Sequence, residues 1–172
     1  MIPERLSRLR REMEQRRIDV YVVPTADFHE SEYVGAHFKA RSYITGFTGS
    51  AGTAIITMTE AGLWTDARYF LQAKHQLENT GVTLYRMGEE GVPTIMEYLR
   101  SALPEGGTLG FDGRVINAHL GAAFLALAEK KNAKLAVGED LVGIIWDDRP
   151  ELPHAPVRIL TAEYSGRSTA DT

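Results

Sequence analysis

The sequence contains no cysteine, and this absence excludes several kinds of site at once. Without thiols there is no disulfide framework, no thiolate metal centre and no cysteine nucleophile. The absence also fits a reducing compartment, and we expect a cytoplasmic location. An excess of one charge is lacking as well, since 19 basic residues face 23 acidic residues and the net charge is −4. Such a balance gives no reason to expect binding to nucleic acid or to an anionic membrane.

Long apolar runs are lacking too. No stretch approaches the roughly 18 apolar residues that a membrane span needs. The first residues carry six arginines and lack the apolar core of a signal peptide. Glutamates at positions 4, 12 and 14 interrupt these arginines, which favours a solvated surface helix over a nucleic-acid arm or a transit peptide. What the chain does have is 172 residues, 44% of them hydrophobic, which is enough for the core of one folded domain.

The first half of the chain predicts a helix, a strand and a hairpin. A helix over 4–17 is indicated by apolar residues that share one helical stripe, namely Ile2, Leu6, Leu9 and Met13. The β-rich run 19–23 predicts a buried strand that stops at a proline. Two further β-rich runs flank a turn and predict a hairpin over 52–65. The segment between is irregular, with a short helix expected near 30–36.

The second half alternates between helical and β-rich segments. Asp66 is a suitable cap for a helix at 67–78. Next come a strand at 82–86, a helix that holds Pro93 in its first turn and runs up to Pro104, and a strand at 108–111. A helix that Asn117 can cap and that ends near Lys131, and a strand at 133–137, follow them. This alternation predicts crossover connections and parallel pairing. The fold class expected is therefore α/β, with a mixed, partly parallel β-sheet flanked by helices on both faces.

The end of the sequence has a different character. Prolines at 150, 153 and 156 predict an extended stretch rather than a helix. The small and polar residues that follow are typical of a linker. We therefore expect one domain over 1–160 and the start of a linker to a further domain over 161–172.

The segment from Asp27 to Tyr33 combines an aspartate, a histidine and two glutamates, and it raises the question of a metal site. The next histidine after His29 is His37, and a spacing of eight residues places no two histidines on one helical face. The pattern favours a helix-capping role for Asp27, with His29 and Glu32 lining a polar surface. We expect no metal site in this chain.

Glycines at 46, 49 and 52 form a second candidate motif. The loop lacks the Gly-Lys-Ser/Thr signature and leads into a strand, so it does not match a phosphate-binding loop. Ser50 is not in a nucleophile elbow, because position 48 is threonine. Tight packing, or the close approach of another chain or a ligand, explains these glycines better.

Arg68 stands in the first turn of its predicted helix, where the helix dipole disfavours a cation. Two explanations remain open: a structural ion pair with Asp66, or an outward-facing guanidinium that binds a carboxylate. Nowhere does the sequence combine a nucleophile with a base or assemble a di-metal ligand set. We therefore expect no catalytic residue in this chain.

Three blocks carry a resemblance to a known family: Asp27-Phe-His29-Glu-Ser-Glu-Tyr33, Arg41-x-Tyr-x-Thr-Gly-Phe-Thr-Gly-Ser-Ala-Gly52 and Leu63-Trp-Thr-Asp66-x-Arg68-Tyr69-Phe70. In this order they resemble the N-terminal domain of cytosolic-type Xaa-Pro aminopeptidases, in the creatinase/prolidase superfamily. The resemblance runs from about residue 4 to 168 and includes Trp146-x-Asp148-Arg149-Pro150. Ala67 departs from it, because the family usually has glycine there.

The resemblance implies a longer protein with two further domains. The last of these would hold two divalent ions, usually Mn²⁺, and would remove the N-terminal residue from peptides with proline second. The N-terminal domain would do no chemistry, but would shape the substrate entrance and the contacts of a homodimer. Substrate-binding residues implied here are Arg68, His29, Arg41 and Tyr69. Two alternatives remain: a free-standing module that binds peptides or amino acids, and the N-terminal domain of a prolidase or creatinase.

Overall fold

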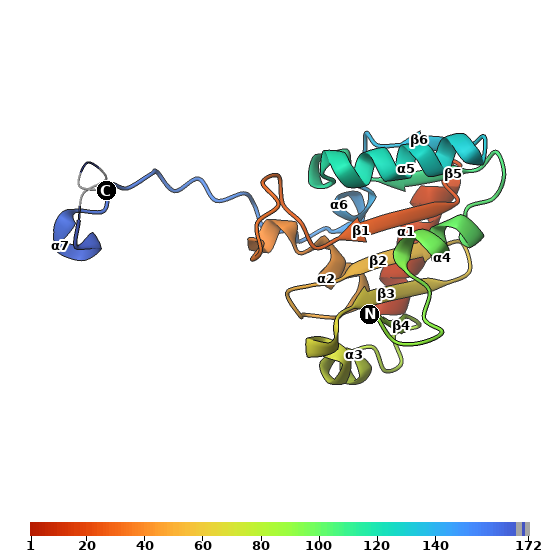
Figure 1. Cartoon of the computed structure of the whole chain (residues 1–172), viewed down its shortest axis with the longest axis horizontal. Helices are drawn as coiled ribbons and strands as arrows, with labels where there is room; N and C mark the ends of the chain where they lie inside the picture. The colour runs from red at the N-terminus through yellow and green to blue at the C-terminus, as the bar shows by residue number, and fades with distance from the viewer. Residues whose placement is uncertain (168–169, 171–172) are drawn as a thin grey trace.

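A computed structural model of the chain describes residues 1–167 and 170. Its centre is one six-stranded sheet in the order β4-β3-β2-β1-β5-β6, with helices on both faces (Figure 1). This arrangement confirms the expected fold class. None of the helices among the described residues is both long and apolar enough to cross a membrane.

Only one strand of the sheet runs against the others. The strands are β1 (Val20–Pro24), β2 (Thr53–Thr57), β3 (Ala61–Thr65), β4 (Thr83–Arg86), β5 (Thr108–Phe111) and β6 (Lys134–Ala136). Strand β2 is antiparallel to β1 and β3, and the remaining pairs are parallel. The carboxyl ends of the other five strands therefore meet at one edge of the sheet, where β2 begins.

Four helices cover one face of the sheet: α1 (Ile2–Gln15), α2 (Ala40–Thr45), α3 (Phe70–Gln76) and α6 (Leu141–Ile145). Successive side chains of a strand point to opposite faces, and on β1 Tyr21 and Val23 point to this one. The apolar stripe of α1 is buried against it through Leu6, Leu9 and Met13. The buried side chains of α1 recur at the helical period of 3.6 residues, and those of β1 at every second residue. Together they pack into one core.

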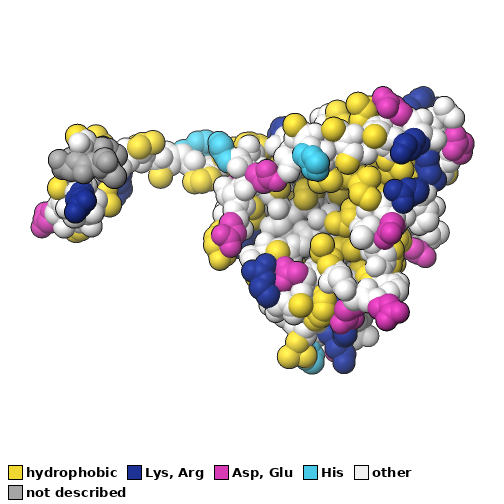
Figure 2. All heavy atoms as spheres, viewed as in Figure 1, with side chains coloured by type: hydrophobic (Ala, Val, Ile, Leu, Met, Phe, Trp, Pro, Cys, Tyr) yellow, Lys and Arg dark blue, Asp and Glu magenta, His cyan; other side chains and the backbone are white. Residues whose placement is uncertain are grey.

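Two helices, α4 (Ile95–Ala102) and α5 (Ala118–Lys130), cover the opposite face. Val20 and Val22 of β1 point into this second core, whose largest side chain is the fully buried Trp64. Trp64 stacks on Tyr85 with ring centroids 4.0 Å apart. Figure 2 shows hydrophobic side chains in the hollowed face between these helices.

The prediction of a short helix near 30–36 is wrong. The Asp27 side chain accepts hydrogen bonds from the backbone N–H groups of His29 and Ser31, at 2.9 and 3.0 Å, which folds this stretch into a turn. Glu30 also has a positive φ of 57°, which is incompatible with a right-handed helix. The helical structure of this region comes later, as a 3₁₀ turn at Ala36–Phe38 (η1) and then α2.

The helix predicted at 67–78 starts differently from expectation. Its first turn is a 3₁₀ turn at Ala67–Tyr69 (η2), capped by the Asp66 side chain, and α3 follows directly. A third 3₁₀ turn, at Gly113–Val115 (η3), follows β5. The tail leaves the body of the molecule after residue 150, extended as predicted, and ends in the short helix α7 (Ala162–Ser165) (Figures 1 and 2).

Candidate functional site

The loops that carry the sequence motifs gather at one edge of the sheet, where five strands end. The segment from Asp27 to Phe38 follows β1, the glycine loop precedes β2, and η2 follows β3. In open α/β sheets, ligands bind at the carboxyl ends of the strands. The topology therefore brings all three motif blocks to the edge that is suited to binding.

Arg68 and Asp66 form a two-point ion pair on this edge. The Arg68 Nε–Asp66 Oδ1 and Nη2–Oδ2 distances are both 2.9 Å, and the Arg68 backbone N–H donates to the same carboxylate at 3.1 Å. The guanidinium holds the pKa of Asp66 below its usual value, and the carboxylate raises the pKa of Arg68. The structural ion pair is thus present, while 68% of the Arg68 side chain remains exposed. Its role in substrate binding stays a prediction.

The same turn occurs a second time in the chain, at a place where the sequence had predicted no site. Arg114 contacts Asp112 through three hydrogen bonds of 3.0, 2.9 and 2.9 Å, in the same pattern. Both turns follow a strand and lead through a 3₁₀ turn toward a helix and a parallel neighbouring strand. The signal was an Asp-x-Arg triplet directly after each strand. The repetition shows that the same ion-paired turn follows both β3 and β5, so the Asp66–Arg68 pair has a structural counterpart in this fold.

Arg41 does not lie on the surface. It is only 4% exposed, and its guanidinium donates to the Thr25 hydroxyl at 2.9 Å, to the Phe47 carbonyl at 2.5 Å and to the Gly49 carbonyl. Burial lowers its pKa to about 10. Its hydrogen bonds go to neutral oxygens, so Arg41 ties the glycine loop to the end of β1.

Tyr69 lies beside that loop. Its hydroxyl is 2.7 Å from the Ser50 hydroxyl, and this hydrogen bond lowers the pKa of Tyr69. A Cβ on Gly49 would lie 2.2 Å from the Phe47 ring and 2.8 Å from the Tyr69 ring. The predicted tight packing of the glycine loop is confirmed, because a side chain at position 49 has no room.

His29 is exposed in the turn that Asp27 holds. The predicted helix-capping role of Asp27 is wrong, because its side chain closes a turn and no helix follows before Ala36. Among residues 1–167 and 170, no three histidine, aspartate or glutamate side chains are grouped so that they could hold a metal ion.

Two surface cavities flank the candidate residues. One of about 370 Å³ lies over Arg41 and is lined by Tyr33, Lys39 and Ser50. The other, of about 380 Å³, is lined by Arg68, Met87 and the acidic pair Glu30 and Glu32. Glu32 and Ser50 line both cavities, so Arg68 lies among acidic and hydroxyl groups on this edge, with the exposed Lys39 at the other cavity. His29 lines neither cavity.

The strand order, the motif blocks and the edge they share agree with one family. The family model described as the creatinase/prolidase N-terminal domain matches residues 5–143. This chain belongs to that family. The solved N-terminal domain of the peptidase PepQ from Mycobacterium tuberculosis, 24% identical with a TM-score of 0.58, shares the fold over 83% of this chain and 98% of its own.

Relatives of this family member carry names that describe aminopeptidases. The probable Xaa-Pro aminopeptidase P of Aspergillus niger is 45% identical over 96% of this chain and 27% of its own length. Aminopeptidase P2 of Arabidopsis thaliana is 40% identical over 99% of this chain and 24% of its own. The chain thus spans about a quarter of the length of these curated relatives.

One solved structure resembles the chain along nearly its whole length. The X-prolyl aminopeptidase from Caenorhabditis elegans, described as a cytosolic enzyme with a di-nuclear active site, has a TM-score of 0.88 and 29% identity. The match covers 99% of this chain and 29% of that one.

Proposed function

We propose that this chain is the non-catalytic N-terminal domain of a metal-dependent Xaa-Pro aminopeptidase. The whole protein would remove the first residue from peptides whose second residue is proline. The observation that carries this proposal is the 45% identity, over 96% of the chain, to a protein named as a probable Xaa-Pro aminopeptidase P. The TM-score of 0.88 to an X-prolyl aminopeptidase over 99% of the chain supports it independently.

The role of this domain in the enzyme would be to shape the substrate entrance. Arg68 supports this role because most of its side chain is exposed at the edge where ligands of such sheets bind. Tyr69 and His29 stand on the same edge, and Arg41 would act from below by holding the glycine loop in place. A planar guanidinium matches a carboxylate in two-point geometry, so the C-terminal carboxylate of a short peptide is the group we assign to Arg68.

The metal ions of the reaction would be held by a catalytic domain outside this chain. We propose two divalent ions, with manganese as their identity. The di-nuclear active site described for the Caenorhabditis elegans enzyme supports the number, and the missing ligand cluster in the described part of this chain supports the location. We further propose a homodimer, a cytoplasmic location, and a linker that starts at residues 161–172 and leads out of the domain over 1–160.

The test is to compare the protein encoded by the whole reading frame with this chain alone. We expect the longer protein, loaded with Mn²⁺, to release the first amino acid from a tripeptide such as Gly-Pro-Leu and not from Gly-Ala-Leu. The chain alone should release nothing. No cleavage by the metal-loaded longer protein would refute the proposal. Binding of the tripeptide by the chain alone, without any turnover in the longer protein, would favour a free-standing binding module instead.

A further inference from the structure

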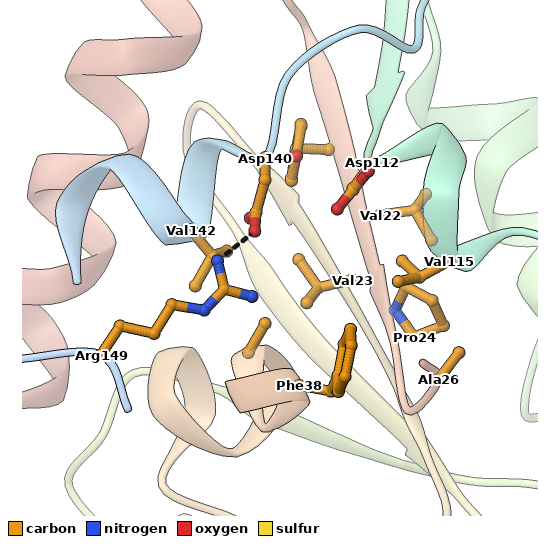
Figure 3. Close-up of a pocket in the computed structure, with 12 residues that line it drawn as sticks. Val22, Val23, Pro24, Ala26, Phe38, Asp112, Val115, Asp140, Val142 and Arg149 are labelled. Atoms are coloured by element: carbon orange, nitrogen blue, oxygen red, sulfur yellow. Dashed lines mark hydrogen bonds and ion pairs between the residues drawn. The ribbon is translucent and has the colours of Figure 1, made fainter. Parts of the chain in front are cut away.

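The sheet has one place where its connections turn in opposite directions, between β1 and β5. From β1 the chain continues to β2 on one side, while β5 adds on the other side, parallel to β1. The crevice outside the carboxyl ends of two such strands is where open α/β sheets bind their ligands. In this chain the crevice has apolar walls, formed by Val23, Pro24, Phe38 and Val142 (Figure 3).

The crevice already contains a charged group, the guanidinium of Arg149. Figure 3 shows this side chain reaching in from the chain that follows α6, toward Asp140. Arg149 Nη1 lies 2.5 Å from Asp140 Oδ2, and Arg149 Nε donates to the His37 carbonyl at 2.8 Å. What remains open is about 20 Å³, which is room for about one water molecule.

The crevice has room for the Arg149 guanidinium because residue 143 is glycine. A Cβ on Gly143 would lie 2.3 Å from Arg149 Nη1 and 2.6 Å from Asp140 Oδ2, so only glycine leaves space for the pair. The other oxygen of Asp140 accepts the Gly143 backbone N–H at 2.8 Å, which fixes the carboxylate at the start of α6. Both side chains of the pair are largely buried, with exposures of 16% for Arg149 and 12% for Asp140.

A second carboxylate lines the crevice and is already neutralised. Asp112 is held by Arg114, whose Nη2 also lies 3.8 Å from Asp140 Oδ2. Two carboxylates therefore face two guanidiniums, and the pair inside the crevice has a balanced charge. A buried carboxylate left without its cation is strongly destabilising, so removing the Arg149 guanidinium would leave an unoccupied cation site.

This pair marks the point where the chain leaves the body of the domain. The residue after Arg149 is Pro150, whose carbonyl accepts a 2.8 Å hydrogen bond from His37 Nδ1. Beyond it, residues 151–160 are all exposed, and within the described part of the chain no hydrogen bond joins them to the rest of the domain. The two contacts of His37, with Arg149 and with Pro150, are therefore the last ones before the tail.

We infer that the crevice between β1 and β5 is a guanidinium-binding site that the chain fills with its own Arg149, and that this contact fixes the direction in which the tail leaves. The crevice where open sheets bind ligands holds Arg149 in this chain, and Arg149 anchors the start of the tail there. The start of the tail is then fixed relative to the edge that carries Arg68. The inference does not depend on the proposed aminopeptidase activity, because both of its readouts are made on this chain alone.

The lack of cysteine allows a direct test. Leu125 on α5 and Leu152, two residues past Pro150, are replaced by cysteine and spin-labelled, and the distance between them is measured by pulsed electron paramagnetic resonance. Both positions are exposed, at 49% and 37%. We expect one narrow distance distribution with arginine at 149 and a distribution several times wider in Arg149→Ala. Adding methylguanidinium at millimolar concentration should leave the distribution wide, because the free ion can fill the vacated position but does not tie the tail to it.

The matched control is Arg158→Ala, which removes an arginine from the exposed tail and should leave the distribution narrow. A second readout covers the case in which Arg149→Ala folds poorly. Methylguanidinium should raise the melting temperature of Arg149→Ala and not that of the parent chain, since a ligand stabilises only a protein that has a free site for it. An unchanged distribution in folded Arg149→Ala, or equal effects of methylguanidinium on both proteins, would overturn the inference.

Discussion

Replacing Arg41 by lysine separates a scaffold role of this residue from direct contact with substrate. The guanidinium joins three oxygens from different segments: the Thr25 hydroxyl and the carbonyls of Phe47 and Gly49. Lysine keeps a positive charge but offers a single compact ammonium in place of a planar fork. It cannot reach all three oxygens from the same backbone position, so we expect two of them to lose their partner.

The expected magnitude follows from the burial of this site. Each buried acceptor left without a partner costs about 1–3 kcal/mol, so two of them cost about 3 kcal/mol in the free energy of unfolding. Burial already lowers the pKa of Arg41 to about 10. The same burial lowers the pKa of a lysine from its lower ordinary value of about 10.4, which weakens the remaining contact further. At about 2–4 °C per kcal/mol for a domain of this size, the melting temperature should fall by about 6–12 °C.

The assay is urea and thermal unfolding of the chain, followed by circular dichroism and by the fluorescence of Trp64 and Trp146. Arg68→Lys is the matched control, because the same change at a 68% exposed side chain should alter the free energy of unfolding by less than about 0.5 kcal/mol. Arg41→Lys with parent-like stability would refute the scaffold argument. If Arg41→Lys kept the stability of the parent chain and raised KM in the longer protein, direct contact of Arg41 with substrate would replace the scaffold role.

Three further predictions concern the same edge. Gly49→Ala should lower the free energy of unfolding by about 1–3 kcal/mol in urea titrations, because the added methyl overlaps the Phe47 ring. In the longer protein, Arg68→Ala should raise KM for the shortest proline peptides with kcat almost unchanged. The control Arg100→Ala, at an exposed position, should alter neither KM nor kcat. If Arg68→Ala instead has a normal KM and a lower melting temperature, Arg68 has only a structural role in its pair with Asp66. Carbon-13 titration should place the pKa of Asp66 below its ordinary value and return it toward that value in Arg68→Ala. Since the folded pKa is the lower one, this pair stabilises the fold at neutral pH, and its contribution is lost as the pH falls below about 4.

The alternation of helices and strands could be predicted because burial imposes a period on the sequence. Leu6, Leu9 and Met13 repeat at helical spacing, and each of them is buried in the core against the sheet. The helix predicted to end near Lys131 begins at its cap Asn117, whose side chain accepts the Leu120 N–H at 2.8 Å. Such signals are local, so one sequence is enough to reveal them.

The positions of the arginines could not be predicted in the same way. Arg41 and Arg68 both stand in motif blocks that contain aromatic residues, yet one is buried beneath the glycine loop and the other is exposed. What separates them is the distribution of acceptors from distant segments, which no local pattern encodes. Arg149 depends on a residue more than 100 positions away, since its Nε donates to the carbonyl of His37. The helix near 30–36 failed for a local reason, because the Asp27 side chain competes for the N–H groups that a helix would use.

The place of β5 beside β1 has a consequence for the order in which the chain folds. Strand β3 follows β2 after a short turn at 58–60, and residues 25–52 separate β1 from β2, so both antiparallel pairings close shorter loops than the pairing of β1 with β5. Val20 of β1 pairs with Leu109 of β5, about 90 residues further along, and closing that loop costs more entropy before any contact is gained. We expect β1–β3 to assemble early and β5 to join late. Asp112 follows β5 and Asp140 follows β6, so the crevice for Arg149 exists only after this late step, and the tail acquires its direction when the rest of the domain has folded.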